Sequence, residues 1–358
     1  MKARKLYKYE PDYAVAPGAT LREVMDSRGM SQKELAVRAG LTVQSLNRIF
    51  RGEQPITHDT AARLELVTGT PARLWNNLES NYRERLVALG ERTRLQADLA
   101  WLKDIPTGEL IARKVLQPAD SEVDLLHNTL SFYGVSSVSA WTELWERPAV
   151  AARRSTCFES LPGPASAWIR LGELQAQQRE CEPFSKARFR AALVRIRALT
   201  REPVAEIEGQ FLDLCSSCGV AVALVKEMAK VPWNGATKWL APKKAMILLS
   251  LRGKSEDKFW FSFFHEAGHV FHDSKKDLLI NDGCQDEPRE VRADRFAADT
   301  LIPARYNARI QAAQRDADIL ALADELGVSP GIVAGRYQFL TRRWSWFKAL
   351  IRPLDWAE

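Results

Sequence analysis

The side chains best suited to catalysis or metal binding lie in one short stretch, which holds three of the chain's five histidines. His265 and His269 are four residues apart, and Glu266 directly follows the first of them. On an α-helix this spacing places both imidazoles on one face, where they can bind a single Zn²⁺. The carboxylate of Glu266 then lies close enough to act as a general base. This HExxH pattern predicts a zinc peptidase centre.

A second amphipathic helix, expected over residues 287–303, supplies a third ligand. Glu290 lies 21 residues after His269. Two imidazoles and one carboxylate leave a fourth position open for water, which is the arrangement of a catalytic zinc. Asp294 follows Glu290 by one helical turn and is expected to accept a hydrogen bond from a ligand histidine. The same ligand set also suits other divalent metals.

Near the N-terminus, two short helices are expected on either side of Gly40. Ser31 and Glu34 form a capping-box pattern, and Thr42 is the expected N-cap of the following helix. A tight turn between such helices gives a helix-turn-helix, whose second helix enters the major groove of DNA. There Gln and Asn bond adenine and Arg bonds guanine, while the first helix contacts phosphate. The expected DNA-binding residues are Gln32, Thr42, Gln44, Ser45, Asn47 and Arg48.

The elements that position these residues are mostly helical. Short helices broken by glycine run from about residue 18 to 89, and a Pro-interrupted helical region follows. Three apolar segments precede the HExxH helix and predict strands over residues 219–225, 238–240 and 245–251. The last of these is a candidate edge strand for pairing with a peptide substrate. The fold class is therefore mainly α with a small β-sheet (α+β).

This pattern divides the chain into three parts. They are a five-helix helix-turn-helix domain (1–89), a helical middle region (90–205) and a zincin-like metallopeptidase domain (206–358).

The composition is that of a globular protein. The chain has 358 residues, of which 46% are hydrophobic and 27% charged, so long disordered or fibrous regions are excluded. A net charge of +6 permits an anionic partner but is too small to demonstrate one. Five cysteines do not make a disulfide framework, and no apolar run reaches the length of a membrane span. We expect a cytoplasmic protein that does not enter a membrane.

The N-terminal segment resembles the XRE helix-turn-helix family over about 70 residues. The sequence from Ala16 to Arg22, together with Gln54-Pro-Ile-Thr57 and Leu74-Trp-Asn-Asn-Leu-Glu79, is most similar to the HigA-type antitoxins. The resemblance implies binding to operator DNA, which we expect to involve a homodimer. Val43 departs from the polar residue that many members carry there, which narrows the base readout. The alternative is a helical bundle that has lost DNA binding and only dimerises.

Residues 120–340 resemble the ImmA/IrrE metallopeptidase family. The resemblance rests on the HExxH motif, the Glu-x-x-Ala-Asp-x-Phe-Ala pattern that begins at Glu290, and the Leu301-Ile-Pro303 that follows. It implies zinc-dependent cleavage of a repressor or partner protein, with His265, His269 and Glu290 as ligands and Glu266 as general base. Many members have histidine where this chain has Asp273, and we interpret the neighbouring His272 as a residue that does not bind the metal.

Two functions follow from these patterns. The first is a DNA-binding transcriptional regulator whose peptidase domain cleaves a partner or repressor protein. The second is a non-enzymatic antitoxin or transcription factor of a toxin–antitoxin system, in which the peptidase fold only binds a cognate toxin or a ligand. The sequence identifies neither the operator nor the protein substrate.

Two C-terminal segments carry weaker patterns. Residues 323–336 resemble a second helix-turn-helix, but we expect them to pack on the metal domain. The tail interleaves basic and aromatic side chains, which could stack on a base but which we interpret as sealing the core. Its residues are Arg342, Arg343, Trp344, Trp346, Phe347 and Lys348.

Overall fold

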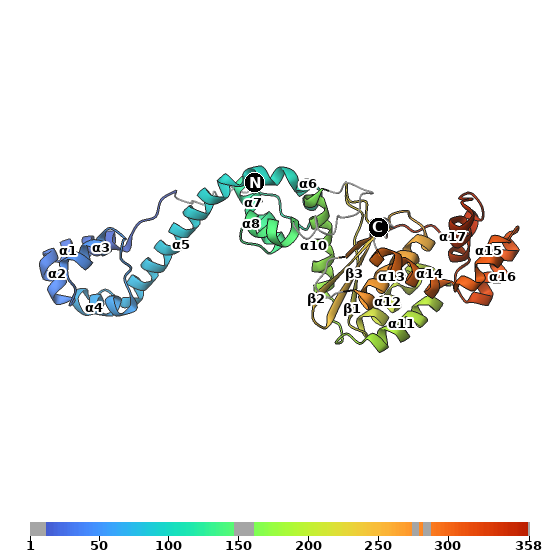
Figure 1. Ribbon diagram of the computed structural model, residues 1–358. Helices are drawn as coiled ribbons and strands as arrows, with labels where there is room; N and C mark the ends of the chain where they lie inside the picture. Colours follow the sequence, from blue (N-terminus) through green and yellow to red (C-terminus); the bar gives the residue numbers. More distant parts are fainter. Residues whose placement is uncertain (1–11, 147–160, 274–278, 282–287, 357–358) are drawn as a thin grey trace, which may run out of the picture. The chain divides into compact units, whose positions relative to one another are not determined.

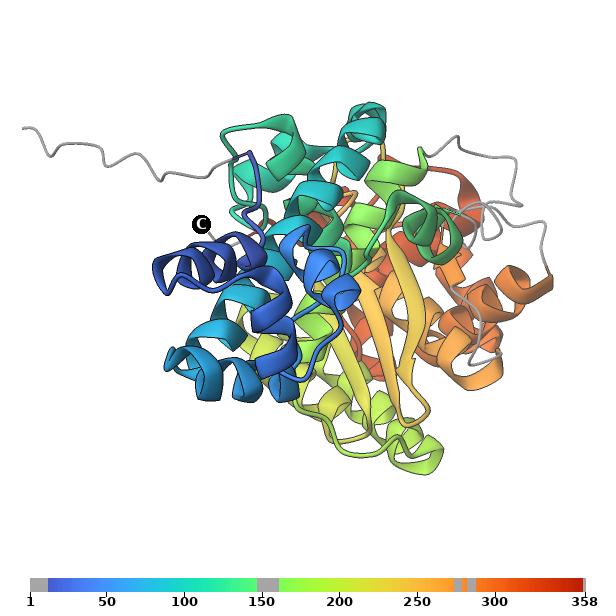
Figure 2. The same ribbon diagram turned by 90° about the vertical axis from the view of Figure 1, so that its left-hand side faces the viewer.

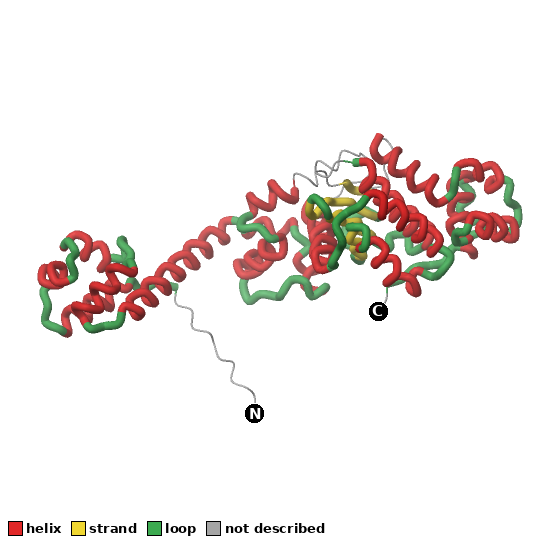
Figure 3. Tube along the Cα trace, turned by 90° about the horizontal axis from the view of Figure 1, so that it is seen from below, coloured by secondary structure: helices red, strands yellow, loops and turns green. Residues whose placement is uncertain are grey.

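A computed structural model of the chain describes residues 12–146, 161–273, 279–281 and 288–356. Helices predominate and the strands are confined to one sheet (Figure 3), so the expected α+β class is confirmed. The chain divides into two compact units, one of residues 1–100 with 119–127 and one of residues 101–118 with 128–358. Within the described residues, no helix combines the length and the apolar character needed to cross a membrane.

The first unit contains the five expected helices around one small core. Each helix contributes a large side chain that is completely buried: Leu21, Leu35, Leu46, Leu64 and Trp75. The boundary expected at residue 89 falls inside the fifth helix, which continues without a break. The helices are α1 (Pro17–Ser27), α2 (Gln32–Arg38), α3 (Val43–Phe50), α4 (His58–Thr68) and α5 (Ala72–Ala97).

The turn between α2 and α3 is built from local hydrogen bonds. Ser31 Oγ accepts from the backbone N of Glu34 at 3.2 Å, but the carboxylate of Glu34 accepts from Arg38 at 2.7 Å instead of completing a capping box. Gly40 adopts φ +64°, a region that favours glycine. Thr42 Oγ1 then accepts from the backbone N of Ser45 at 3.0 Å and begins α3, as expected.

The second unit is organised by a four-stranded sheet in the order β1-β3-β2-β4. β1 runs parallel to β3, whereas β2 is antiparallel to both β3 and β4. The prediction of an edge strand at 245–251 is wrong, because β3 is bonded on both sides and its backbone groups are already used. The strand at 279–281 was not expected. The strands are β1 (Val220–Leu224), β2 (Gly235–Ala241), β3 (Lys244–Leu249) and β4 (Leu279–Asn281).

Two long helices cover opposite faces of this sheet, α10 (Pro162–Gln178) and α13 (Glu256–His272). The strand alternation explains the arrangement, because successive side chains point to opposite faces. Thr237 of β2 bonds to α13, while Leu248, the cross-strand partner of the preceding residue Ala236, lies against Gly172 of α10. Figures 1 and 2 show the strands side by side, with α10 and α13 on either side of them.

A large hydrophobic core joins α13 to the helices around it. Ile332 and Val333 of α17 lie in the same buried cluster as Phe259 and Phe263 of α13, so the expected packing of the 323–336 segment is confirmed. The other described α-helices are α6 (Thr107–Ala112), α7 (Glu122–Tyr133), α8 (Val138–Trp141), α11 (Lys186–Leu199), α12 (Val204–Ser216), α14 (Pro288–Leu301), α15 (Asn307–Gln311), α16 (Asp316–Leu326) and α17 (Pro330–Thr341).

Candidate metal centre and nucleic-acid interface

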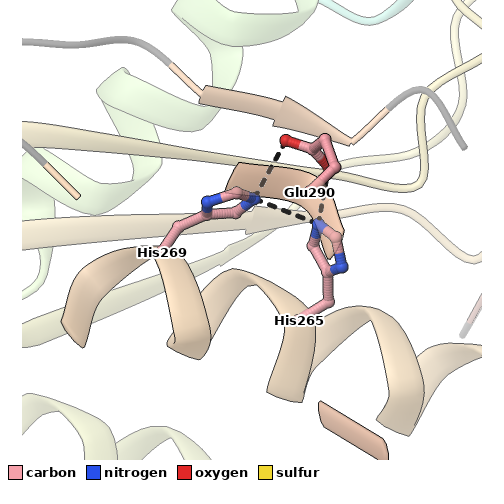
Figure 4. A group of neighbouring side chains, drawn as sticks. All are labelled: His265, His269 and Glu290. Atoms are coloured by element: carbon pink, nitrogen blue, oxygen red, sulfur yellow. Dashed lines mark hydrogen bonds and ion pairs between the residues drawn. The ribbon is translucent and has the colours of Figure 1, made fainter. Parts of the chain in front are cut away.

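Three potential metal ligands converge between α13 and α14. The helical spacing brings His265 Nε2 and His269 Nε2 to 3.0 Å from each other. Glu290 of α14 lies opposite, with one carboxylate oxygen 3.0 Å from His265 Nε2 and the other 3.3 Å from His269 Nε2. All three side chains are buried, and Figure 4 shows them directed at one common point. The three residues offer ligand atoms that lie within 4.8 Å of one another.

Each imidazole is oriented by a carboxylate on its outer side. His265 Nδ1 lies 2.8 Å from Asp294 Oδ1, and His269 Nδ1 lies 2.7 Å from Asp273 Oδ2. Arg292 donates to the other oxygen of Asp273 and fixes that carboxylate. Asp294 therefore lies where the sequence analysis expected it. The contact of Asp273 was missed, although its position four residues after His269, directly after the last residue of α13, was an available signal.

The electrostatics of the group favour a cation. Burial lowers the pKa of both histidines, but the carboxylates outweigh it and raise the pKa of His265 to about 9 and that of His269 to about 10. Burial raises the pKa of Glu290, but hydrogen bonds from the two imidazoles outweigh this and hold it at about 2. These shifts describe a buried pocket of negative potential.

The donor set fits a divalent metal. When the two rings are neutral and their Nδ1–H groups donate to the outer carboxylates, each ring directs an Nε2 lone pair at the other. Two lone pairs 3.0 Å apart repel each other unless a cation lies between them. Two imidazole nitrogens and one carboxylate are ligands of Zn²⁺, and they also suit related divalent ions. His272, at the exposed end of α13, is not part of the group found among the described residues.

Glu266 is held against β2 by two residues that the sequence analysis did not identify. Thr237 Oγ1 donates to Glu266 Oε2 at 2.6 Å, while Oε1 has no hydrogen-bond partner within the part of the chain that the structure describes. Gly235 leaves room for that oxygen, since a Cβ there would lie only 2.6 Å from it. Burial raises the pKa of Glu266. The carboxylate is therefore fixed by one oxygen and available through the other.

A glycine sets the distance between the two ligand-bearing helices. A Cβ on Gly268 would lie 3.2 Å from the Cα of Ala293 and 3.2 Å from the ring of Phe296. The absence of a side chain lets the backbone of α14 approach α13 closely, which brings Glu290 within bonding distance of both histidines. The middle of the HExxH motif thus has a packing role beside its chemical one.

The residues expected to contact DNA lie around the start of α3. The amide of Gln32 donates to Asn47 Oδ1, so these two expected contacts are joined to each other. Gln44 and Arg48 are exposed on the recognition helix. Thr42 and Ser45 are linked through the N-cap hydrogen bond at 3.0 Å. The structure therefore leaves Gln44 and Arg48 as the side chains best able to reach base edges.

Both units match known family models. Residues 21–75 match the helix-turn-helix model, and residues 225–338 match that of the IrrE N-terminal-like domain, a peptidase family. The two resemblances deduced from the sequence, XRE-type at the N-terminus and ImmA/IrrE-like at the C-terminus, are confirmed.

Several solved structures resemble the N-terminal part of the chain. The antitoxin HigA of Pseudomonas aeruginosa, solved with its higBA promoter, is 27% identical, covering 24% of this chain and 94% of that one, with a TM-score of 0.22. Another Pseudomonas aeruginosa protein, solved with its operator DNA, is 30% identical over 21% of this chain and 82% of its own, with a TM-score of 0.20. An addiction module antidote protein of the HigA family from Coxiella burnetii is 27% identical over 24% and 92%, with a TM-score of 0.22. A search of curated proteins gave no match.

Proposed function

We propose that this protein is a transcriptional regulator that binds operator DNA and carries a zinc-dependent endopeptidase, which cleaves a partner or repressor protein. The chain combines a DNA-binding helix-turn-helix with a peptidase-family domain. The observation that carries the enzymatic part of the proposal is the convergence of His265, His269 and Glu290 beside the buried carboxylate of Glu266, whose Oε1 has no hydrogen-bond partner among the described residues.

Each residue of the centre then has a definite task. His265, His269 and Glu290 hold the metal, and Asp294 and Asp273 keep the two Nε2 atoms turned inward. Bound Zn²⁺ would supply Lewis acidity, which polarises a peptide carbonyl and favours ionisation of water.

Glu266 moves the proton in this proposal. Its Oε1 takes a proton from the attacking water and later delivers it to the amine nitrogen that leaves when the peptide bond breaks. Thr237 holds Oε2 at 2.6 Å during both transfers. The pKa of Glu266, raised by burial, makes the carboxylate a stronger base than one in water.

The DNA-binding part of the proposal rests on α3. Gln44 and Arg48 are exposed on one helix whose N-terminus is fixed by the Thr42 cap. Helix-turn-helix proteins commonly bind as dimers to half-sites one helical turn apart. We therefore propose a homodimer that reads a two-fold symmetric operator.

The decisive experiment compares the wild type with Glu266→Gln. Both proteins are assayed for bound zinc and for cleavage of the proteins encoded by neighbouring genes. We expect equal zinc content and a loss of cleavage of about 10²–10⁴-fold, because the variant cannot accept the proton. His272→Gln is the matched control and should cleave as the wild type does.

The result also separates the proposal from its alternative. Equal zinc content with no cleavage by either protein, across these substrates, would contradict the peptidase. A stable complex with a neighbouring toxin would then favour the non-enzymatic antitoxin. Absence of zinc from the wild type would contradict the metal centre itself.

A further inference from the structure

The tail that follows α17 is a rigid loop. Arg342 and Phe347 adopt φ +61° and +57°, which are uncommon for residues other than glycine. The conformation is held by Gln338, whose amide donates to the carbonyl of Trp346 at 2.7 Å, and by Tyr337, whose ring packs against both Trp346 and Phe347. The side chains between these points are therefore presented in a fixed arrangement.

The aromatic residues of this tail divide into two groups. Phe347 is buried and belongs to the core, as the sequence analysis expected of the whole tail. Trp344, Phe339 and Trp346, in contrast, are 58%, 42% and 36% exposed. Phe339 is near the end of α17, and all three rings lie between residues 339 and 346. Several exposed aromatic rings in one short segment indicate an interaction site. Trp346 covers the buried ring of Tyr337 with one face, but sealing the core does not account for the exposed rings of Trp344 and Phe339.

The same surface is strongly basic. Residues 335–350 contain four basic side chains and no acid. Arg342 lies over the ring of Phe339 and Arg343 over the ring of Trp346, each with its guanidinium carbon 4.9 Å from the ring centre. Within the described part of the chain, neither arginine forms an ion pair, and Arg336 is occupied by a hydrogen bond to Asn307. Arg343 Nη1 donates to the hydroxyl of Tyr337 at 3.4 Å. The other guanidinium N–H groups of Arg342 and Arg343 have no partner within the described residues and can bind an anionic ligand.

We propose that this aromatic–basic surface binds single-stranded nucleic acid. It consists of Phe339, Arg342, Arg343, Trp344, Trp346 and Lys348. Phosphate groups pair with the arginines and Lys348, while Trp344, which has no ring partner among the described residues, stacks on an unpaired base. An acidic protein segment would satisfy the cations but would leave the exposed rings without a role. A duplex would satisfy the cations but would not offer its base faces. The surface is independent of the helix-turn-helix and of the metal centre.

The test uses the full-length chain carrying Gln44→Ala and Arg48→Ala, which removes base readout by α3. The probe is a fluorescein-labelled 20-nucleotide oligothymidine, and binding is followed by fluorescence anisotropy over a range of salt concentrations. Trp344→Ala should weaken binding about tenfold through the loss of one stacked base, and Trp344→Phe should restore most of it. Arg342→Ala with Arg343→Ala should lower the slope of log affinity against log salt by about 1.4, or about 0.7 for each phosphate contact.

Arg305→Ala is the matched control, because Arg305 is also exposed and lies over an aromatic ring, that of Tyr306, at 5.3 Å. It should leave the affinity and the salt slope unchanged. Oligothymidine binding that is equal in all variants would overturn the proposal. So would weakening by Arg305→Ala as large as that by the tail variants, since binding would then reflect general charge. Poly-glutamate binding that is tighter than oligothymidine binding and depends on Trp344 would assign the surface to an acidic protein instead.

Discussion

The recognition helix α3 and the candidate metal centre between α13 and α14 differ in how far their side chains are exposed and held in place. Gln44 and Arg48 are exposed on a small helical domain, and only the backbone beneath them is fixed. His265, His269 and Glu290 are buried, and each bonds to at least one other member of the site. Surface recognition needs side chains that can exchange water for a ligand, whereas a buried centre holds its side chains in place through contacts with one another and excludes bulk water.

This difference has a consequence for substitution. A residue on the exposed face of α3 can be changed without altering the core, so that binding is lost while the fold stays intact. A residue of the metal group cannot be changed without leaving a buried neighbour unpaired. The following predictions test that contrast, from the largest effect to the smallest.

The largest effect is expected at the exposed site. Gln44→Ala combined with Arg48→Ala should weaken specific operator binding by about 10²–10⁴-fold, since each bidentate base contact contributes about 1–3 kcal/mol. The melting temperature should not change, because both side chains are exposed. An operator selected from random duplexes and a gel-shift titration provide the measurement. Arg92→Ala, an exposed arginine on α5, is the control. Unchanged specific binding would mean that α3 does not read the bases.

The second-largest effect is expected when the space beside Glu266, the proposed general base, is filled. Gly235→Ala would place a Cβ 2.6 Å from Glu266 Oε1 and displace that carboxylate. Cleavage should fall by about 10²-fold, as expected for a misplacement of roughly 1 Å, with zinc content unchanged. Gly209→Ala on α12 is the control, since a Cβ there meets nothing within 4 Å. It should keep the rate and stabilise the fold by about 0.5–1 kcal/mol. Equal rates in both variants would show that Glu266 tolerates displacement.

A smaller effect is expected from the residues that orient the ligands. Asp273→Asn weakens the hydrogen bond that turns His269 Nε2 inward, and zinc affinity should fall by about 10–100-fold. Competition with a chromogenic chelator measures the change. Asp299→Asn, an exposed change on α14, should have no effect. If both variants bind zinc as the wild type does, the outer carboxylate contributes nothing to the site.

The smallest effect is the release of protons from His265 and His269 when zinc binds. The pKa values of about 9 and about 10 place His265 and His269 in the protonated range at pH 7 when no metal is bound. Each Nε2 atom then carries a proton, and zinc must displace both protons to bind between the two rings, whose Nε2 atoms lie 3.0 Å apart. Titration calorimetry in two buffers of different ionisation enthalpy should therefore detect release of about one proton or more per zinc, and affinity should rise with pH up to these values. Binding without proton release would mean that the histidines are already neutral.

The sequence predicted contacts between residues close together in the chain better than contacts between distant segments. His265 and His269 are juxtaposed by helix periodicity alone, and the caps at Ser31 and Thr42 are local as well. The prediction of Glu290 and Asp294 depended on a motif that extends over two helices. Its spacing and its resemblance to a known family indicated that these residues lie beside the two histidines. These parts of the fold and of the candidate site were accessible from residue types and spacing.

The remaining contacts depend on how distant segments meet. Nothing local marks Thr237 and Gly235 as neighbours of Glu266, because only the position of β2 in the sheet brings them beside that carboxylate. The position of β3 in the middle of the sheet was likewise missed, since an apolar run does not reveal which strands lie beside it. The tail illustrates a third limit, because composition does not separate the buried ring of Phe347 from the exposed ring of Trp344.

The close approach of α13 and α14 at Gly268 limits how this motif can drift through evolution. Each of its five positions has a structural or a proposed chemical role. His265 and His269 belong to the candidate metal centre, Glu266 to the proposed proton transfer, Ala267 to the core and Gly268 to the contact with the neighbouring helix. The variable positions of an HExxH pattern are, in this chain, as restricted as the named ones. A variant without the carboxylate of Glu266 would still need Gly268, because a side chain there would push α14 away from α13.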